Sequence, residues 1–227
     1  DCGVRVLEYS LSGVNALYYN PKQDGWRYDH TQPKRRIDPC GGRFDLGPEF
    51  TTPKHPVLWL GQWRGEITGP RAARLISCDD DAVGVRVMRD FELAENSTEL
   101  IVCQTLKNIS TQNIRVGHWS RTLAVPDGIC FLPGLEKSVF PDGYVEYGKN
   151  LIDYHPQDEN IVVENGMAII KGRTINPKLA FFSNSGKIAY LSKNNLWFFK
   201  EYPIYSDAVY HDGVVPLNLC IYYHEKF

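Results

Sequence analysis

Residues 83–93 decide the fold class, and they read Val-Gly-Val-Arg-Val-Met-Arg-Asp-Phe-Glu-Leu. Side chains alternate across a β-strand, so the valines at odd positions would share one face with Arg89. That face is apolar, as a half-buried strand requires. The pattern predicts a strand with one side against a core.

Runs of the same kind recur on both sides of this stretch. They are rich in Val, Ile, Tyr, Phe and Thr and lie between Gly, Pro, Asn and Asp, whereas helical periodicity is hard to find. The pair Asn165-Gly166 favours the positive φ angles of a tight hairpin turn. Strands are predicted at residues 4–9, 16–19, 64–68, 72–77, 83–93, 99–108, 114–124, 144–147, 161–164, 167–171, 179–183, 188–191, 196–201 and 217–223.

The strands predict an all-β fold, a large antiparallel β-sandwich. The chain has 227 residues without a linker-like tract, and sandwiches of about 200–250 residues often form one domain. One domain over residues 1–227 is therefore expected. Segments 20–56 and 127–143, rich in Pro, Gly and charge, are predicted as long loops over one concave face. The first residue is Asp1 rather than Met, which indicates a processed protein or a sequence trimmed at its ends.

Composition argues against several functional classes. The chain has 25 Lys and Arg against 27 Asp and Glu, a formal net charge of −2, so no nucleic-acid partner is expected. No run approaches the roughly 18 apolar residues of a membrane span. The six cysteines form no Cys-x-x-Cys pair and no zinc-like cluster, so neither a metal nor a cofactor is predicted. The sequence allows the cysteines to form disulfides or to remain as buried free thiols.

Residues 41–49, Gly-Gly-Arg-Phe-Asp-Leu-Gly-Pro-Glu, form the first candidate binding segment. The paired glycines allow a close turn, and Arg43 with the two nearby carboxylates Asp45 and Glu49 can place donors and acceptors around a polyhydroxylated ligand. The alternative is a structural turn in which Arg43 is bridged to Asp45 or Glu49. The sequence does not choose between them.

Residues 55–66 form the second candidate segment and contain His55, Trp59 and Trp63. Sugar sites place flat apolar rings beside polar groups, so these three residues are predicted to contact a sugar. Large aromatic residues are also usual in cores. The alternative is that Trp59 and Trp63 are simply core residues.

Residues 117–122, Gly-His-Trp-Ser-Arg-Thr, form the third candidate segment. In a strand Trp119 and Arg121 share one face, and His118 points to the other. An unperturbed histidine has a pKa of about 6.5 and suits proton transfer at neutral pH. A lone strand histidine is more often structural, which is the alternative for His118.

The order of these motifs resembles the galactose-mutarotase-like, or aldose 1-epimerase-like, superfamily. The resemblance rests on residues 4–9 and 13–17, then Gly-Gly-x-Phe, then the His/Trp/Gly segment, and finally residues 106–108 leading into Gly117-His118. The Gly-Gly-Arg-Phe and His-Trp-Ser-Arg-Thr blocks are similar to an uncharacterised branch of that superfamily. The resemblance implies a supersandwich fold and a mono- or oligosaccharide ligand.

The resemblance also implies roles for single residues. His118 would be the general acid on the ring oxygen, and Arg43 and His55 would hold the sugar. Glu49 and Arg121, from the first and third candidate segments, are predicted as further binding residues. The family's general base is a Glu after the last strand, for which Glu225 is a weak substitute so near the end of the sequence. An acid without its base opens the ring poorly.

The sequence thus supports a carbohydrate-binding or carbohydrate-processing protein, most specifically one with an aldose 1-epimerase-like activity. The alternative is a non-catalytic carbohydrate-binding or accessory module of a polysaccharide-utilisation system. A β-domain without a small ligand is a third interpretation. A hydrolase or lyase that uses carboxylates such as Asp80 or Asp142 ranks lower, because such clusters usually mark solvated turns.

Overall fold

The computed structural model describes residues 3–27, 29 and 41–223 of the chain. In this part, the regular elements are strands apart from α1 (Pro56–Leu60) and the 3-10 turn η1 (Pro21–Gln23), and every strand pair is antiparallel. The predicted all-β antiparallel fold is confirmed. The chain divides into two compact units, Asp1–Leu123 and Ala124–Phe227, and a single domain over residues 1–227 stays a prediction.

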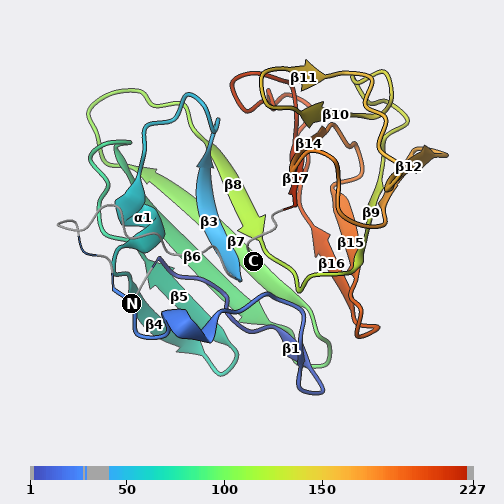
Figure 1. Cartoon of the computed structure of the whole chain (residues 1–227). Coiled ribbons are helices and arrows are strands. Elements are labelled where there is room, and N and C mark those ends of the chain that lie inside the picture. The colour runs from blue at the N-terminus through green and yellow to red at the C-terminus, as the bar shows by residue number, and fades with distance from the viewer. Residues whose placement is uncertain (1–2, 28, 30–40, 224–227) are drawn as a thin grey trace. The chain divides into compact units, whose positions relative to one another are not determined.

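The first unit is built on a four-stranded sheet and a separate two-stranded ladder (Figure 1). The sheet has the order β4 (Arg64–Gly69), β5 (Ala72–Ile76), β6 (Val85–Leu93) and β7 (Leu100–Asn108). The ladder pairs β3 (Gly42–Gly47) with β8 (Gly117–Thr122), and a small hairpin joins β1 (Ser10–Leu11) to β2 (Val14–Asn15).

One side of β3 packs against the valines of β6. Phe44 and Leu46 of β3, Leu58 of α1, and Val85 and Val87 of β6 belong to one buried cluster. The alternation predicted for residues 83–93 is confirmed, because the two valines are fully buried and Arg89 is 3% exposed. This packing leaves the other side of β3 to Arg43 and Asp45, since neighbouring side chains point to opposite faces.

The second unit is a β-sandwich of two sheets. One sheet has the order β11 (Ile152–Asp153), β10 (Tyr144–Tyr147), β14 (Lys178–Phe181) and β17 (Leu219–Tyr222). The other has the order β12 (Ile161–Glu164), β13 (Met167–Ile170), β9 (Ile129–Pro133), β15 (Lys187–Leu191) and β16 (Trp197–Glu201). Leu132 and Ala168 from the second sheet share a buried cluster with Leu179 and Phe181 from the first.

Several local predictions were wrong, and others are confirmed. The predicted loops 20–56 and 127–143 contain β3 and β9, because their Gly and Pro residues flank short alternating runs. Residues 4–9 form no strand, and Val6 makes only an isolated bridge to Gly42. The predicted turn between β12 and β13 is confirmed, with φ angles of 49° at Asn165 and 71° at Gly166.

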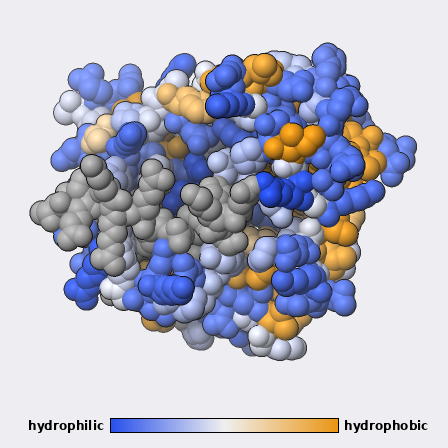
Figure 2. All heavy atoms as spheres, in the orientation of Figure 1, coloured by the Kyte–Doolittle hydropathy of each residue, from blue (hydrophilic) through white to orange (hydrophobic). Residues whose placement is uncertain are grey.

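The surface seen in Figure 2 is mainly polar, with the apolar residues of the described part in small patches. Within residues 3–27, 29 and 41–223, no helix is long and apolar enough to cross a membrane. Cys78, Cys103 and Cys130 are free thiols. Cys2 and Cys40 lie outside the described residues.

Candidate functional site

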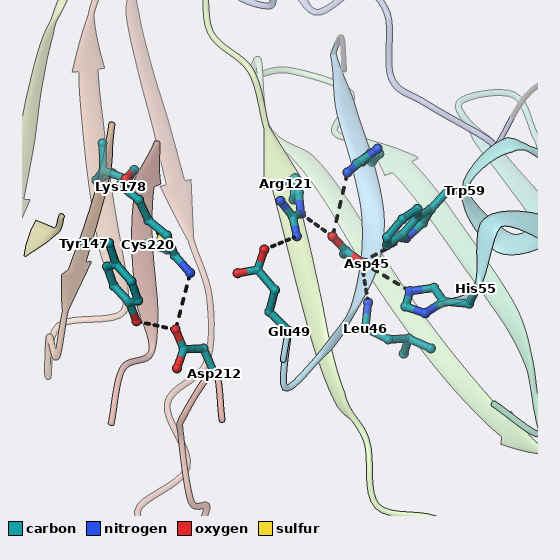
Figure 3. A network of polar contacts seen from close by, with 12 residues as sticks. Asp45, Leu46, Glu49, His55, Trp59, Arg121, Tyr147, Lys178, Asp212 and Cys220 are labelled. Atoms are coloured by element: carbon teal, nitrogen blue, oxygen red, sulfur yellow. Dashed lines mark hydrogen bonds and ion pairs between the residues drawn. The ribbon is translucent and has the colours of Figure 1, made fainter. Parts of the chain in front are cut away.

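A buried carboxylate, Asp45, is the centre of a polar cluster in the first unit (Figure 3). It lies in the middle of β3, is 1% exposed, and points away from the side that carries Phe44 and Leu46. We call Asp45 with Arg43, Glu49, His55, Trp59 and Arg121 the Asp45 cluster.

Both oxygens of Asp45 are held by several donors. Oδ1 accepts hydrogen bonds from Trp59 Nε1 at 2.9 Å and from the Leu46 backbone N–H at 2.9 Å. Oδ2 accepts a hydrogen bond from Arg121 Nε and lies 3.9 Å from a guanidinium nitrogen of Arg43. A buried charge is tolerated when it is paired and hydrogen-bonded in this way.

The helix α1 positions two of these donors. His55 immediately precedes α1, Trp59 lies one turn later, and their rings meet edge to face with centroids 4.5 Å apart. His55 Nε2 is 3.3 Å from Asp45 Oδ1, and its Nδ1 is 2.7 Å from the Pro53 carbonyl oxygen. Both ring nitrogens therefore face acceptors, and a protonated imidazolium would donate to both.

The electrostatics of the cluster favour an ionised Asp45. Burial alone would raise the pKa of this carboxyl, but the hydrogen bond from His55 and the charges of Arg121 and Arg43 lower it below the usual 3.8. Asp45 is therefore a fixed negative charge rather than a proton donor. Its acceptor sites are largely used within the protein, so its role is to hold its neighbours in place.

The neighbours of Asp45 form the part of the cluster that reaches solvent. The Arg43 guanidinium carbon lies 5.1 Å from the centroid of the Trp59 ring, a cation–π arrangement. Arg121 reaches Glu49 with a nitrogen-to-oxygen distance of 3.6 Å. The side chains of Arg121 and Glu49 are 35% and 33% exposed, so both can meet a ligand.

The chain was compared with family models, with curated proteins and with solved structures. None of them matches. The resemblance to the galactose-mutarotase-like superfamily therefore stays a prediction, and the chemistry of the site has to carry the functional argument.

The structure brings five of the predicted site residues together: Arg43, Glu49, His55, Trp59 and Arg121. Arg43, His55, Trp59 and Arg121 converge on Asp45, and Glu49 joins them through Arg121. Sequence reasoning considered Asp45 either as a carboxylate that helps Arg43 bind a ligand or as a bridge for Arg43 in a structural turn. That bridge exists, but it lies within a strand rather than a turn. The signal for a central Asp45 was the alternation of polar Arg43 and Asp45 with apolar Phe44 and Leu46.

Trp63 and His118 lie elsewhere. Trp63 is 8% exposed, belongs to the core cluster and donates its indole N–H to the Leu58 carbonyl oxygen at 3.1 Å. His118 sits opposite Leu46 in the ladder, with its ring centroid 5.7 Å from that of Phe44. It therefore lies on the face of the ladder opposite to Asp45. Glu225, the weak candidate for a base, is outside the described residues.

The second unit holds a polar cluster of its own, also drawn in Figure 3. Lys178 Nζ lies 4.1 Å from the centroid of the Tyr147 ring and 3.4 Å from Asp212 Oδ2. Asp212 also accepts hydrogen bonds from Tyr147 Oη and from the Val214 and Val215 backbone N–H groups. These bonds tie residues 212–215 to strands β10 and β14. Among the described residues, no group of three or more His, Cys, Asp or Glu could hold a metal ion.

Proposed function

We propose that the chain binds a carbohydrate at the solvent-facing edge of the Asp45 cluster. The observation that carries this proposal is the convergence of Arg43, Trp59 and Arg121 on one buried carboxylate, with Glu49 joined to them through Arg121. A guanidinium and a carboxylate offer donors and acceptors to sugar hydroxyls, and an indole offers an apolar edge to ring C–H groups. Because Asp45 orders these side chains before a ligand arrives, less entropy is lost on binding.

Binding without catalysis is the version that we favour. A mutarotase-type reaction needs an acid and a base at the two ends of the same ring opening, and the proposed acid His118 is on the other face of the β3–β8 ladder. Asp45, with its lowered pKa and its many donors, is a poor proton carrier. The aldose 1-epimerase-like activity remains the second candidate, supported by the order of the sequence motifs.

Titration of the full chain with aldoses and oligosaccharides, followed by ligand-observed NMR, tests the proposal. We expect saturable binding that weakens by roughly tenfold in Glu49→Gln, since one charge-assisted hydrogen bond is removed. Glu95→Gln, an exposed carboxylate in a turn of the same unit, is the matched control and should bind like the parent. Equal binding by Glu49→Gln and the parent, or no binding of any sugar, would overturn the proposal.

The same samples distinguish the two versions of the function. Exchange NMR follows interconversion of the anomers with the parent and with His118→Ala. Sugar binding without acceleration supports the non-catalytic module. Acceleration that disappears in His118→Ala would replace it by the mutarotase-type enzyme.

A further inference from the structure

The second unit contains a cavity of about 630 Å³, separate from the Tyr147–Lys178–Asp212 cluster. It is lined by residues 135–136, 138, 140–144, 156–158, 161 and 163–166, which include the turn between β12 and β13. Its volume lies within the roughly 300–1,000 Å³ that is usual for small-molecule sites. Nothing in the proposed carbohydrate site of the first unit uses it.

The charged residues that line this cavity are all acidic, and one of them, Asp142, is also paired with His155, which is outside the lining, at 3.0 Å from Nδ1 to Oδ2. Glu136, Asp142, Asp158 and Glu164 line the cavity, and no Lys, Arg or His is among the described lining residues. Asp158 is 6% exposed and is held as an acceptor by the backbone N–H groups of Asn160 at 2.9 Å and Ile175 at 2.6 Å. A cavity with such walls concentrates positive charge.

A second, independent feature of the wall is the hydroxyl group of Tyr144. Tyr144 is 4% exposed, and its ring stacks on Phe181 in the core with centroids 5.7 Å apart. Among the described residues, no group forms a hydrogen bond with its Oη. Burial raises the pKa of Tyr144, and the carboxylates of Glu146, Asp158 and Asp142 raise it further. The hydroxyl therefore stays protonated and has a hydrogen bond to donate.

The arrangement of the carboxylates does not suit a bare metal ion. Metal sites need ligands at about 2.0–2.6 Å from one centre, and the described carboxylates form no group close enough for that. Spread around a cavity, they suit a larger cation. An ammonium group has three N–H donors for such acceptors, and a ligand oxygen would accept the hydrogen bond from Tyr144.

We propose that this cavity binds a small organic cation that carries hydroxyl groups, of the chemical class of the amino sugars. The ammonium group lies among Asp142, Asp158 and Glu164, and a ligand hydroxyl accepts from Tyr144 Oη. The site does not depend on carbohydrate binding at the Asp45 cluster.

Titration of the full chain with glucosamine below neutral pH, with glucose as the neutral match, tests this site. Isothermal titration should show saturable glucosamine binding that is at least about tenfold tighter than glucose binding and weakens with added salt. Asp142→Asn combined with Glu164→Gln should weaken it by about tenfold or more. Glu159→Gln, an exposed carboxylate outside the wall, should leave it unchanged.

Two further variants make the test specific. Tyr144→Phe removes only the hydroxyl, so it should weaken glucosamine binding several-fold while the thermal unfolding midpoint is kept. Arg43→Ala, in the first unit, should leave glucosamine binding intact. The proposal fails if glucose binds as tightly as glucosamine, if glucosamine shows no saturation, or if Tyr144→Phe and the carboxylate variant both bind like the parent. Loss of glucosamine binding in Arg43→Ala would move the ligand to the Asp45 cluster and leave the proposed function standing.

Discussion

Trp59 Nε1 donates a hydrogen bond of 2.9 Å to Asp45 Oδ1, and this single bond joins helix α1 to strand β3. The same oxygen accepts from the Leu46 backbone and lies near His55. Asp45 is therefore the side chain on which Arg43, His55, Trp59 and Arg121 converge, and Arg121 links it to Glu49.

Replacement of Asp45 by Asn should destabilise the protein by about 3 kcal/mol, because Arg121 and Arg43 lose their buried countercharge. Urea unfolding followed by Trp fluorescence measures the change. Asp79→Asn, which breaks an exposed ion pair with Arg86 in the same unit, should leave the midpoint nearly unchanged. Similar midpoints for the two variants would contradict the structural role of Asp45.

The contribution of Asp45 should also depend on pH in one direction. Its folded-state pKa is below the usual 3.8, so its stabilisation is present above that pH and is lost as the pH falls through the folded-state value. The difference in unfolding midpoint between the parent and Asp45→Asn should therefore shrink on acidification below pH 3.8. A difference that stays constant would show that the charge of Asp45 does not stabilise the fold.

Glu146 should show the opposite pH dependence in the second unit. It is 2% exposed, accepts one hydrogen bond from Asn176 at 2.8 Å, and its pKa is raised, first by burial and then by the nearby charges of Asp158 and Asp153. Stability should fall as the pH rises from the usual 4.5 through the higher folded-state value, because the folded protein retains the proton longer.

Glu146→Gln keeps an acceptor for Asn176 and should remove the loss of stability that the parent shows as the pH rises. Its thermal midpoint at neutral pH should equal or exceed that of the parent, whereas Glu159→Gln, at an exposed neighbouring position, should follow the parent at every pH. A variant that unfolds well below the parent at neutral pH would mean that the charged form of Glu146 is stabilising.

The close approach of β3 and β8 should make Gly47 sensitive to substitution. A Cβ atom at Gly47 would lie 2.2 Å from Trp119 Nε1, whereas one at Gly42 in the same strand would be at an ordinary 3.6 Å from Val6. Gly47→Ala should therefore cost about 1–3 kcal/mol, and Gly42→Ala far less. Equal unfolding midpoints would show that Trp119 moves aside without cost.

The middle strand of the five-stranded sheet offers a test of the second core. Leu132 in β9 is fully buried, whereas Leu151 in the same unit is 66% exposed. Leu132→Ala should lower the free energy of unfolding by about 3 kcal/mol through loss of packing and a residual cavity. Leu151→Ala should change it by less than about 1 kcal/mol.

The long alternating strands could be predicted from the sequence because burial on one face leaves a period of two. Residues 83–93 illustrate this, since even the burial of Arg89 follows from its place in the pattern. β3 was missed because its glycines and charges suggest a turn, and only hydrogen bonds from residues distant in sequence make a buried Asp45 acceptable.

Separation along the chain explains which other features of the sites could not be predicted from the sequence. Residues 43, 49, 55 and 59 are near one another along the chain, so a shared site was a natural inference, but Arg121 joins them only through the pairing of β3 with β8. The opposite orientation of His118, in contrast, follows from strand alternation and was predicted from the sequence. The cavity of the second unit could not be predicted at all, because its wall combines three separate segments.

The ladder that places Gly42 opposite Thr122 has a consequence for the order in which the protein forms. Its paired residues are 70 to 80 positions apart in the chain. Closing such a loop is entropically costly unless the intervening β4–β7 meander has already folded. During synthesis the Asp45 cluster can assemble only after β8 has left the ribosome. Until then Asp45 lacks its partner Arg121 and β3 carries an unpaired edge, so the nascent first unit is at its most vulnerable to misassociation just before it becomes complete.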